Sequence, residues 1–168
     1  GLGKLPVYQD EQFRYLTEKL NGYITGAYVY NKMGLTEQVA TTITIATPNP
    51  VRRFRFKNLD IECVKAYCMV YPDESLVPYL RLLDAIKDMK RIPGTTGQDI
   101  YNRVKSQYFN GYSLPELEKI VSLAKSYPPR VRKVVADILG DIRQTVLQTE
   151  MAKTLLPTTR FNLDYKTA

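Results

Sequence analysis

The chain has 168 residues, enough for one domain with a substantial hydrophobic core and too few for two comfortable ones. It is 44% hydrophobic and 24% charged, which excludes disordered and fibrous proteins, and its apolar runs fall far short of the roughly 20 residues of a membrane-spanning helix. The formal net charge of +7 favours an acidic partner, either nucleic acid or an acidic protein.

The cysteine and histidine content argues against a catalytic or metal-binding protein. The chain contains no histidine, and its two cysteines, Cys63 and Cys68, are five positions apart. This set assembles neither a zinc site nor a disulfide framework, so both cysteines are predicted to be small buried residues. The lack of histidine also removes the commonest general base near neutral pH and the nucleophilic schemes that use it. We therefore expect a protein that is not an enzyme and that needs no metal or cofactor.

The N-terminal part of the chain predicts two short helices followed by three strands. Apolar residues recur at helical spacing in DEQFRYLTEKLN, and the alternating β-branched residues of TTITIAT are the clearest strand signal. The predicted elements are helices over 10–21 and 24–34 and strands over 41–47, 51–57 and 59–66. Since the last two strands join around Asn58, residues 41–67 are expected to form a small antiparallel sheet of three strands.

From residue 74 onward the pattern is helical. Stripes of leucine, isoleucine and valine, and a capping box at Ser113 and Glu116, predict helices over 75–91, 98–108, 113–125 and 129–150. An extended tail is predicted within residues 143–168, because polar and apolar side chains alternate along residues 158–165. The predicted fold class is therefore α+β, with two helices before the sheet and a helical bundle after it, in a single domain over residues 1–168.

The stretch NPVRRFRFKN, residues 49–58, interleaves cations with two phenylalanines. Its cations are Arg52, Arg53, Arg55 and Lys57. On a strand the last three share one face and the phenylalanines the other, so the cations are predicted to be exposed and the aromatic rings buried. Such a row could neutralise neighbouring phosphates of a nucleic acid. The alternative is a solvated face whose charges are balanced by Asp60 and Glu62 on the next strand.

A second basic cluster opens the helix predicted over 129–150. It consists of Arg130, Arg132 and Lys133. Cations in a first helical turn face the positive end of the helix dipole, which suggests that they meet an anion or an acidic partner. Simple tolerance on a long helix is the alternative.

Two further interpretations of the N-terminal half are weaker. Glu62 and Lys65 resemble the acidic-plus-lysine pair of metal-dependent nucleases, but three positions apart on a strand they point to opposite faces. Two helices and a hairpin resemble a winged helix-turn-helix with RRFRFK as its wing, but residues 24–34 would make a mostly apolar recognition helix. A degenerate nuclease and an autonomous nucleic-acid-binding module stay open as alternatives.

The run YITGAYVYNKMGLTEQVATTITIAT, followed by RRFRFKNLDIECVK, resembles the AbiEi-type antitoxins. These are transcriptional regulators of bacterial type IV toxin–antitoxin systems. The more specific elements are GLT-x-Q-V, which leads into an I-x-I-A-T strand, and the joint YPPRVR. The likeness continues through the leucine-rich helices and covers about residues 4–142.

The resemblance implies the C-terminal effector domain of such an antitoxin. Members of the family usually carry an N-terminal winged helix that binds operator DNA. The resemblance implies that this chain, which opens at GLGKLP, starts just after that domain, as an excised domain or a shortened relative. The family's DNA-reading residues therefore have no positions here. The implied role in abortive infection is to counteract a nucleotidyltransferase-like toxin, without a stable complex being required, and to assist transcriptional repression. The expected location is the cytoplasm, without membrane association.

Overall fold

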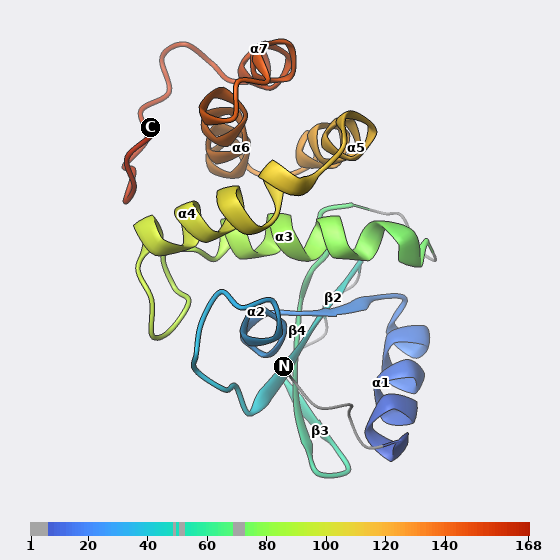
Figure 1. Ribbon diagram of the computed structural model, residues 1–168. Coiled ribbons are helices and arrows are strands. Elements are labelled where there is room, and N and C mark those ends of the chain that lie inside the picture. The colour runs from blue at the N-terminus through green and yellow to red at the C-terminus, as the bar shows by residue number, and fades with distance from the viewer. Residues whose placement is uncertain (1–6, 49, 51–52, 69–72) are drawn as a thin grey trace. The chain divides into compact units, whose positions relative to one another are not determined.

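The computed structural model describes residues 7–48, 50, 53–68 and 73–168 (Figure 1). These residues form an α+β fold with one mixed sheet, and the predicted fold class is confirmed. Backbone contacts divide the chain into two compact units, residues 1–77 and 78–168. The expectation that residues 1–168 act as a single domain stays a prediction.

The first unit combines two helices with a four-stranded sheet. Its elements are α1 (Val7–Leu20), β1 (Tyr23–Thr25), α2 (Ala27–Lys32), β2 (Thr42–Thr47), β3 (Phe54–Phe56), β4 (Leu59–Lys65) and the 3-10 turn η1 (Glu74–Leu76). The strand order in the sheet is β1-β2-β4-β3. Successive side chains of a strand point to opposite faces of the sheet, so the apolar residues of the strands gather on one face. The helices α1 and α2 pack on that face. The buried residues of this core are Phe13, Leu16, Ile24, Val29, Ile43, Ile45 and Ile61.

The predicted antiparallel sheet is wrong in one pairing. As expected, β4 pairs antiparallel with β3 across a two-residue turn, with Phe56 opposite Leu59. Against β2, however, β4 runs parallel, with Thr42 opposite Asp60. The strand β3 takes the outer position, so the hairpin inserts β4 between β3 and β2. The residue pattern identifies strands but does not record their order, because a middle and an outer strand have similar local sequences.

A short strand replaces the first residues of the helix predicted over 24–34. The strand β1 pairs antiparallel with β2, and α2 begins only at Ala27. Gly26 permits this change of direction, since its φ is 82° and a Cβ there would lie 2.5 Å from Thr44 Oγ1. The two helices of the winged helix-turn-helix interpretation do not follow each other directly, because β1 separates α1 from α2.

The second unit is helical. Its elements are α3 (Val77–Lys87), which begins at the boundary of the units, α4 (Gly97–Gln107), the 3-10 turn η2 (Phe109–Gly111), α5 (Leu114–Ala124), α6 (Pro129–Asp141) and α7 (Thr145–Ala152). The capping box is confirmed: the Ser113 hydroxyl accepts a hydrogen bond from the Glu116 N–H, and the Glu116 carboxylate accepts one from the Ser113 N–H. The predicted apolar stripes are buried, as at Leu83, Val135 and Leu139.

The helix predicted over 129–150 is in fact two helices. After α6 ends at Asp141, Arg143 adopts a φ of 65° and the chain turns into α7. The predicted extended tail is wrong for α7 itself, whereas residues 153–168 contain neither helix nor strand. Their last part, the tail segment (residues 160–168), returns to α4 and α6.

Candidate partner and nucleic-acid interface

The first candidate surface is the β3–β4 hairpin. Arg53, Arg55 and Lys57 are exposed, as predicted, and the two phenylalanines between them are half-buried against the core, less than the full burial predicted. Lys57 lies in the turn instead of on the strand, with a φ of 54°. Arg52 lies outside the described residues. The hairpin therefore presents three described cations to solvent.

The arginines of the hairpin are paired with carboxylates of the neighbouring strand. Arg53 Nη2 lies 3.4 Å from Glu62 Oε2, and Arg55 Nε lies 3.5 Å from Asp60 Oδ1. This is the arrangement expected of a solvated face, and it balances two of the three described cations. Because the arginine side chains are 77% and 70% exposed, each pair contributes only about 0–1 kcal/mol. A phosphate could therefore displace either carboxylate with little loss of stability.

Most of the net positive charge lies in the helical unit. Residues 78–168 contain 15 of the 24 lysines and arginines and 9 of the 17 acidic residues, a net charge of +6. Residues 1–77 have a net charge of +1. The charge that favours an acidic partner is therefore not concentrated in the unit that contains RRFRFK, a signal that segment-by-segment counting in the sequence would have found.

The second candidate surface, at the start of α6, is bonded within its own unit. Arg130 Nη2 lies 2.6 Å from Asp164 Oδ1, and Arg130 Nη1 donates a hydrogen bond to the Asn162 carbonyl at 3.0 Å. Lys133 Nζ lies 2.9 Å from Asp137 Oδ1, one turn further along α6. The charges of Arg130 and Lys133 are thus engaged by the protein itself, and an outside partner would have to compete for them.

Arg132 explains how a cation is accommodated in the first turn of α6. Its Nε donates to the Tyr127 carbonyl at 3.1 Å, and its Nη1 donates to the Thr154 carbonyl at 2.6 Å. These carbonyls lie just beyond the C-terminal ends of α5 and α7, where the helix dipole is negative. The guanidinium group therefore bridges two helix ends, which the sequence pattern alone did not indicate.

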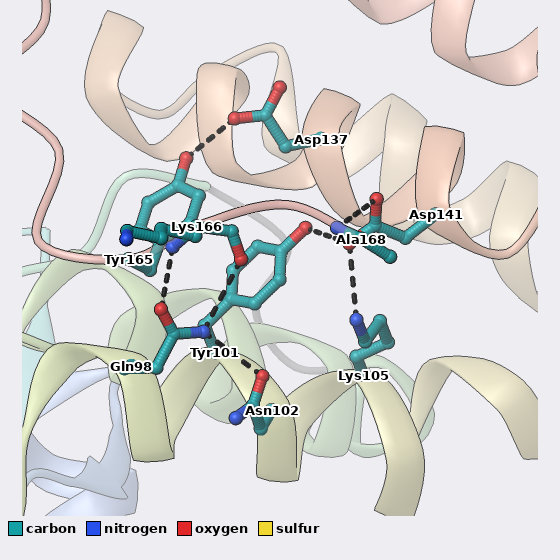
Figure 2. Close-up of polar contacts among 9 residues, drawn as sticks. All are labelled: Gln98, Tyr101, Asn102, Lys105, Asp137, Asp141, Tyr165, Lys166 and Ala168. Carbon is teal, nitrogen blue, oxygen red and sulfur yellow. Dashed lines mark hydrogen bonds and ion pairs between the residues drawn. The ribbon is translucent and has the colours of Figure 1, made fainter.

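A polar network between α4, α6 and the tail segment was missed by the sequence analysis (Figure 2). The Tyr101 hydroxyl donates to Asp141 Oδ2 at 2.6 Å, and Lys105 Nζ lies 3.1 Å from the same oxygen. The Tyr165 hydroxyl donates to Asp137 Oδ2 at 2.7 Å, and its ring stacks on that of Tyr101 with the centroids 4.3 Å apart. The only sequence signal was the spacing of four residues within each helix, which places each pair on one face.

The pKa shifts of this network follow from its burial and its hydrogen bonds. Burial raises the pKa of Tyr101, and the bond to Asp141 raises it further. Burial likewise raises the pKa of Tyr165. Burial also raises the pKa of Asp141, but hydrogen bonds from Tyr101, the Ala168 N–H and Lys105 outweigh this effect and hold that pKa below its ordinary value. Neutral phenols and an ionised carboxylate at neutral pH suit an arrangement that stabilises the structure.

No group of three or more Cys, Asp or Glu side chains among the described residues is placed to hold a metal ion. Cys63 and Cys68 are half-buried, less than the full burial predicted. Glu62, the carboxylate of the nuclease alternative, lies against Arg53 of the hairpin, and the neighbouring Asp60 lies against Arg55.

Within the part of the chain that the structure describes, none of the helices is long and apolar enough to cross a membrane. Comparisons with protein-family models, with curated proteins and with solved structures give no match to the chain. The resemblance to the AbiEi-type antitoxins therefore rests on the sequence motifs alone.

Proposed function

We propose that this chain is the non-catalytic effector domain of an AbiEi-type antitoxin and autorepressor. In this role it counteracts a nucleotidyltransferase-like toxin, with no stable complex required, and assists repression at operator DNA that a separate winged helix binds. The proposed process is abortive infection, and the proposed location is the cytoplasm.

The observation that carries the proposal concerns GLTEQV, the most specific motif of the resemblance. Gly34 ends α2 with a φ of 76°, and the fully buried Leu35 donates its N–H to the Tyr30 carbonyl. The Thr36 hydroxyl accepts a hydrogen bond from the Gln38 N–H at 3.2 Å. The motif thus specifies how the chain leaves α2 on its way to β2. A motif that determines how two elements of the fold are connected supports the proposal that the chain shares the fold of the AbiEi-type antitoxins. Such a motif also fits a role without catalysis.

The joint YPPRVR has a similar structural explanation. Tyr127 is buried, and its hydroxyl donates to Asp84 Oδ1 at 2.7 Å. Pro129 opens α6, where a missing N–H leaves no hydrogen bond unmade. Arg132 bridges the helix ends described above. Both motifs of the resemblance therefore lie at joints of the fold, which supports the same proposal.

An autonomous nucleic-acid-binding module is the second candidate function. It is favoured by the high exposure of Arg53 and Arg55, whose ion pairs are weak enough for phosphates to replace. For a degenerate nuclease, a divalent ion would have to draw Asp60 and Glu62 away from both arginines.

The proposal is tested by rescue of growth in cells that express the cognate toxin. Co-expression of this chain alone should restore growth, because the effector domain, and not the DNA-binding winged helix, is proposed to neutralise the toxin. The control is a destabilised chain of equal length, Gly26→Val, which should not rescue because Gly26 has a positive φ and contacts Thr44 closely. Continued growth arrest with folded, soluble wild-type protein present would refute the proposal.

Salt-dependent binding to duplex DNA separates the two candidates. The logarithm of the DNA-binding constant falls linearly with the logarithm of the salt concentration. Replacing Arg53, Arg55 and Lys57 by alanine should make this slope shallower by about 3 if the hairpin contacts three phosphates. The matched control removes three exposed lysines of the helical unit, Lys119, Lys125 and Lys153. Binding lost only in the hairpin variant, with toxin rescue absent, would favour the nucleic-acid module.

A further inference from the structure

The tail segment is held on a defined surface of the helical unit, mostly through polar contacts (Figure 2). We call this surface the tail-binding surface; the residues that contact the tail segment are Lys90, Gln98, Tyr101, Arg130, Asp137 and Asp141. Tyr165 is the one side chain of residues 160–168 that is buried, at 6% exposed. The remaining side chains of the tail segment are exposed or half-buried. Packing of apolar side chains alone therefore does not explain why the segment lies where it does.

Two adjacent side chains of the tail segment are recognised individually. The Tyr165 ring stacks on Tyr101 at an interplanar angle of 10°, and its hydroxyl donates to Asp137. The Asp164 carboxylate accepts a hydrogen bond from Arg130. A Cβ on Gly97 would lie 1.8 Å from Asp164 Oδ2, so the glycine leaves room for this carboxylate at the start of α4. An aspartate followed by a tyrosine is thus the pair of side chains that the surface fits.

The backbone of the tail segment is recognised as well. Gln98 binds both backbone polar groups of Lys166: its Oε1 accepts from the Lys166 N–H at 2.6 Å, and its Nε2 donates to the Lys166 carbonyl at 3.3 Å. The Asp141 carboxylate accepts from the Ala168 N–H at 3.0 Å. The Asn162 carbonyl accepts from Lys90 at 2.7 Å and from Arg130 at 3.0 Å. Backbone bonds with side-chain contacts at fixed positions are how proteins bind extended peptides of other chains.

We propose that the tail-binding surface is a recognition site for an extended peptide with an Asp-Tyr pair, occupied in this chain by its own tail segment. A partner protein that presents such a peptide would displace residues 160–168 and bind in their place. The inference stands apart from the proposed antitoxin function, because it rests only on contacts within the helical unit.

Release of the tail segment requires few buried contacts to break. Tyr165 is its one buried side chain, and residues 156–160, which lead to it from α7, are all exposed. Segments with little buried apolar area are those that open locally well before the whole protein unfolds. Tethering gives the tail segment an effective concentration on the order of 1 mM. The same segment from a second copy of the chain makes no additional contacts and so does not displace the tethered one. A partner peptide that makes additional contacts can displace it.

The test uses the full chain with its own tail segment loosened. Asp164→Ala together with Tyr165→Ala removes both recognised side chains and leaves the tail-binding surface intact. The probe is a fluorescein-labelled peptide with the sequence RFNLDYKTA, that of residues 160–168, followed by fluorescence anisotropy. We expect saturable binding to this variant and apparent binding to the wild type that is about tenfold weaker or more, because the tethered segment competes. A peptide with alanine in place of the tyrosine should not bind.

Two variants show whether the peptide occupies the proposed surface. In the loosened background, Gln98→Ala and Asp137→Ala should each weaken peptide binding about tenfold or more, since each removes a side chain that hydrogen-bonds to the tail segment. Glu118→Ala, an exposed change on α5, should leave binding unchanged. Circular dichroism verifies that each variant is folded, and amide exchange verifies that residues 162–168 of the loosened variant are released.

Three results would overturn the proposal. The first is the absence of peptide binding at about 1 mM to a loosened variant that is folded and has a released tail segment. The second is binding that ignores the tyrosine of the peptide or the Gln98 and Asp137 substitutions. The third is a concentration-dependent dimer of the wild type that Tyr165→Ala abolishes, because the occupant would then be a second copy of this chain.

Discussion

The Asp141 carboxylate accepts hydrogen bonds from the Tyr101 hydroxyl at 2.6 Å, from Lys105 at 3.1 Å and from the Ala168 N–H at 3.0 Å, and its side chain is only 6% exposed. Asp141→Ala removes all three acceptor contacts at once. Tyr101 is fully buried, so its unpaired hydroxyl should cost about 1–3 kcal/mol. The Lys105 side chain is 21% exposed, so water can partly solvate its ammonium group after the substitution. The loss of this ion pair should therefore cost less free energy than the loss of a fully buried one.

We therefore expect Asp141→Ala to lower the free energy of unfolding by about 2–4 kcal/mol, measured by urea denaturation at pH 7. Because the chain has two compact units, the transition must first be shown to be two-state with two independent probes. Glu118→Ala, an exposed acidic residue on α5, is the matched control and should change the free energy by less than about 0.5 kcal/mol. A loss below about 0.5 kcal/mol for Asp141→Ala would refute the view that this network stabilises the helical unit.

The pH dependence gives an independent check of the same carboxylate. The pKa of Asp141 lies below its ordinary value of 3.8, so its ionised form is favoured by folding. The stabilisation is present above that ordinary pKa and is lost as the pH falls through the lower folded-state pKa. Asp141→Ala should therefore lose part of the acid-induced decrease in stability that the wild type shows. If both proteins lose the same stability as the pH falls, other carboxylates cause that decrease.

Arg132→Lys keeps the charge, but one ammonium group does not reach the Tyr127 and Thr154 carbonyls together, so urea denaturation should show a loss of about 1–3 kcal/mol; wild-type stability would mean that the bridge is dispensable. Arg55→Ala removes an exposed ion pair and should change the free energy of unfolding by less than about 1 kcal/mol, and a larger loss would show that the hairpin charges are structural. Gly97→Ala should displace the tail segment without unfolding α4, giving faster amide exchange at residues 162–168 and unchanged helical circular dichroism; unchanged exchange would contradict the close approach of Asp164. Burial raises the pKa of Tyr112 to about 12 from an ordinary value of 10.0, so the folded state keeps this proton where the unfolded state loses it. The free energy of unfolding should fall as the pH rises from about 10 to about 12, and Tyr112→Phe should reduce that slope; an unaltered slope would assign it to other groups.

The candidate hairpin could be derived almost completely from the sequence, because its geometry is local. The alternation of exposed cations and half-buried phenylalanines follows from the pleat of a strand. A two-residue turn after Phe56 then places Arg55 opposite Asp60, which is the pairing observed. Its use by a partner is a different matter, since exposed charges and weak ion pairs are compatible with a binding surface and with a solvated face alike.

The second cluster shows where such reasoning fails. From the sequence, Arg130 and Arg132 look misplaced at the positive end of a helix, which suggested an outside partner. In the structure their acceptors are Asp164, 34 positions away, and the carbonyl of Thr154, 22 positions away. No periodicity within one segment indicates that a later segment will return to supply them.

By itself the sequence determined the α+β class, the strand TTITIAT, the capping box at Ser113 and the buried faces of the helices, since these depend on side-chain period and on hydrogen bonds between near neighbours. Only the tertiary structure decided that β4 runs parallel to β2, that β1 precedes α2, and that the tail segment lies on α4 and α6. The physical reason is that local residues restrict the backbone angles and the face that a segment buries. Which distant segments then meet depends on the apolar area and the polar groups that the whole chain must satisfy together.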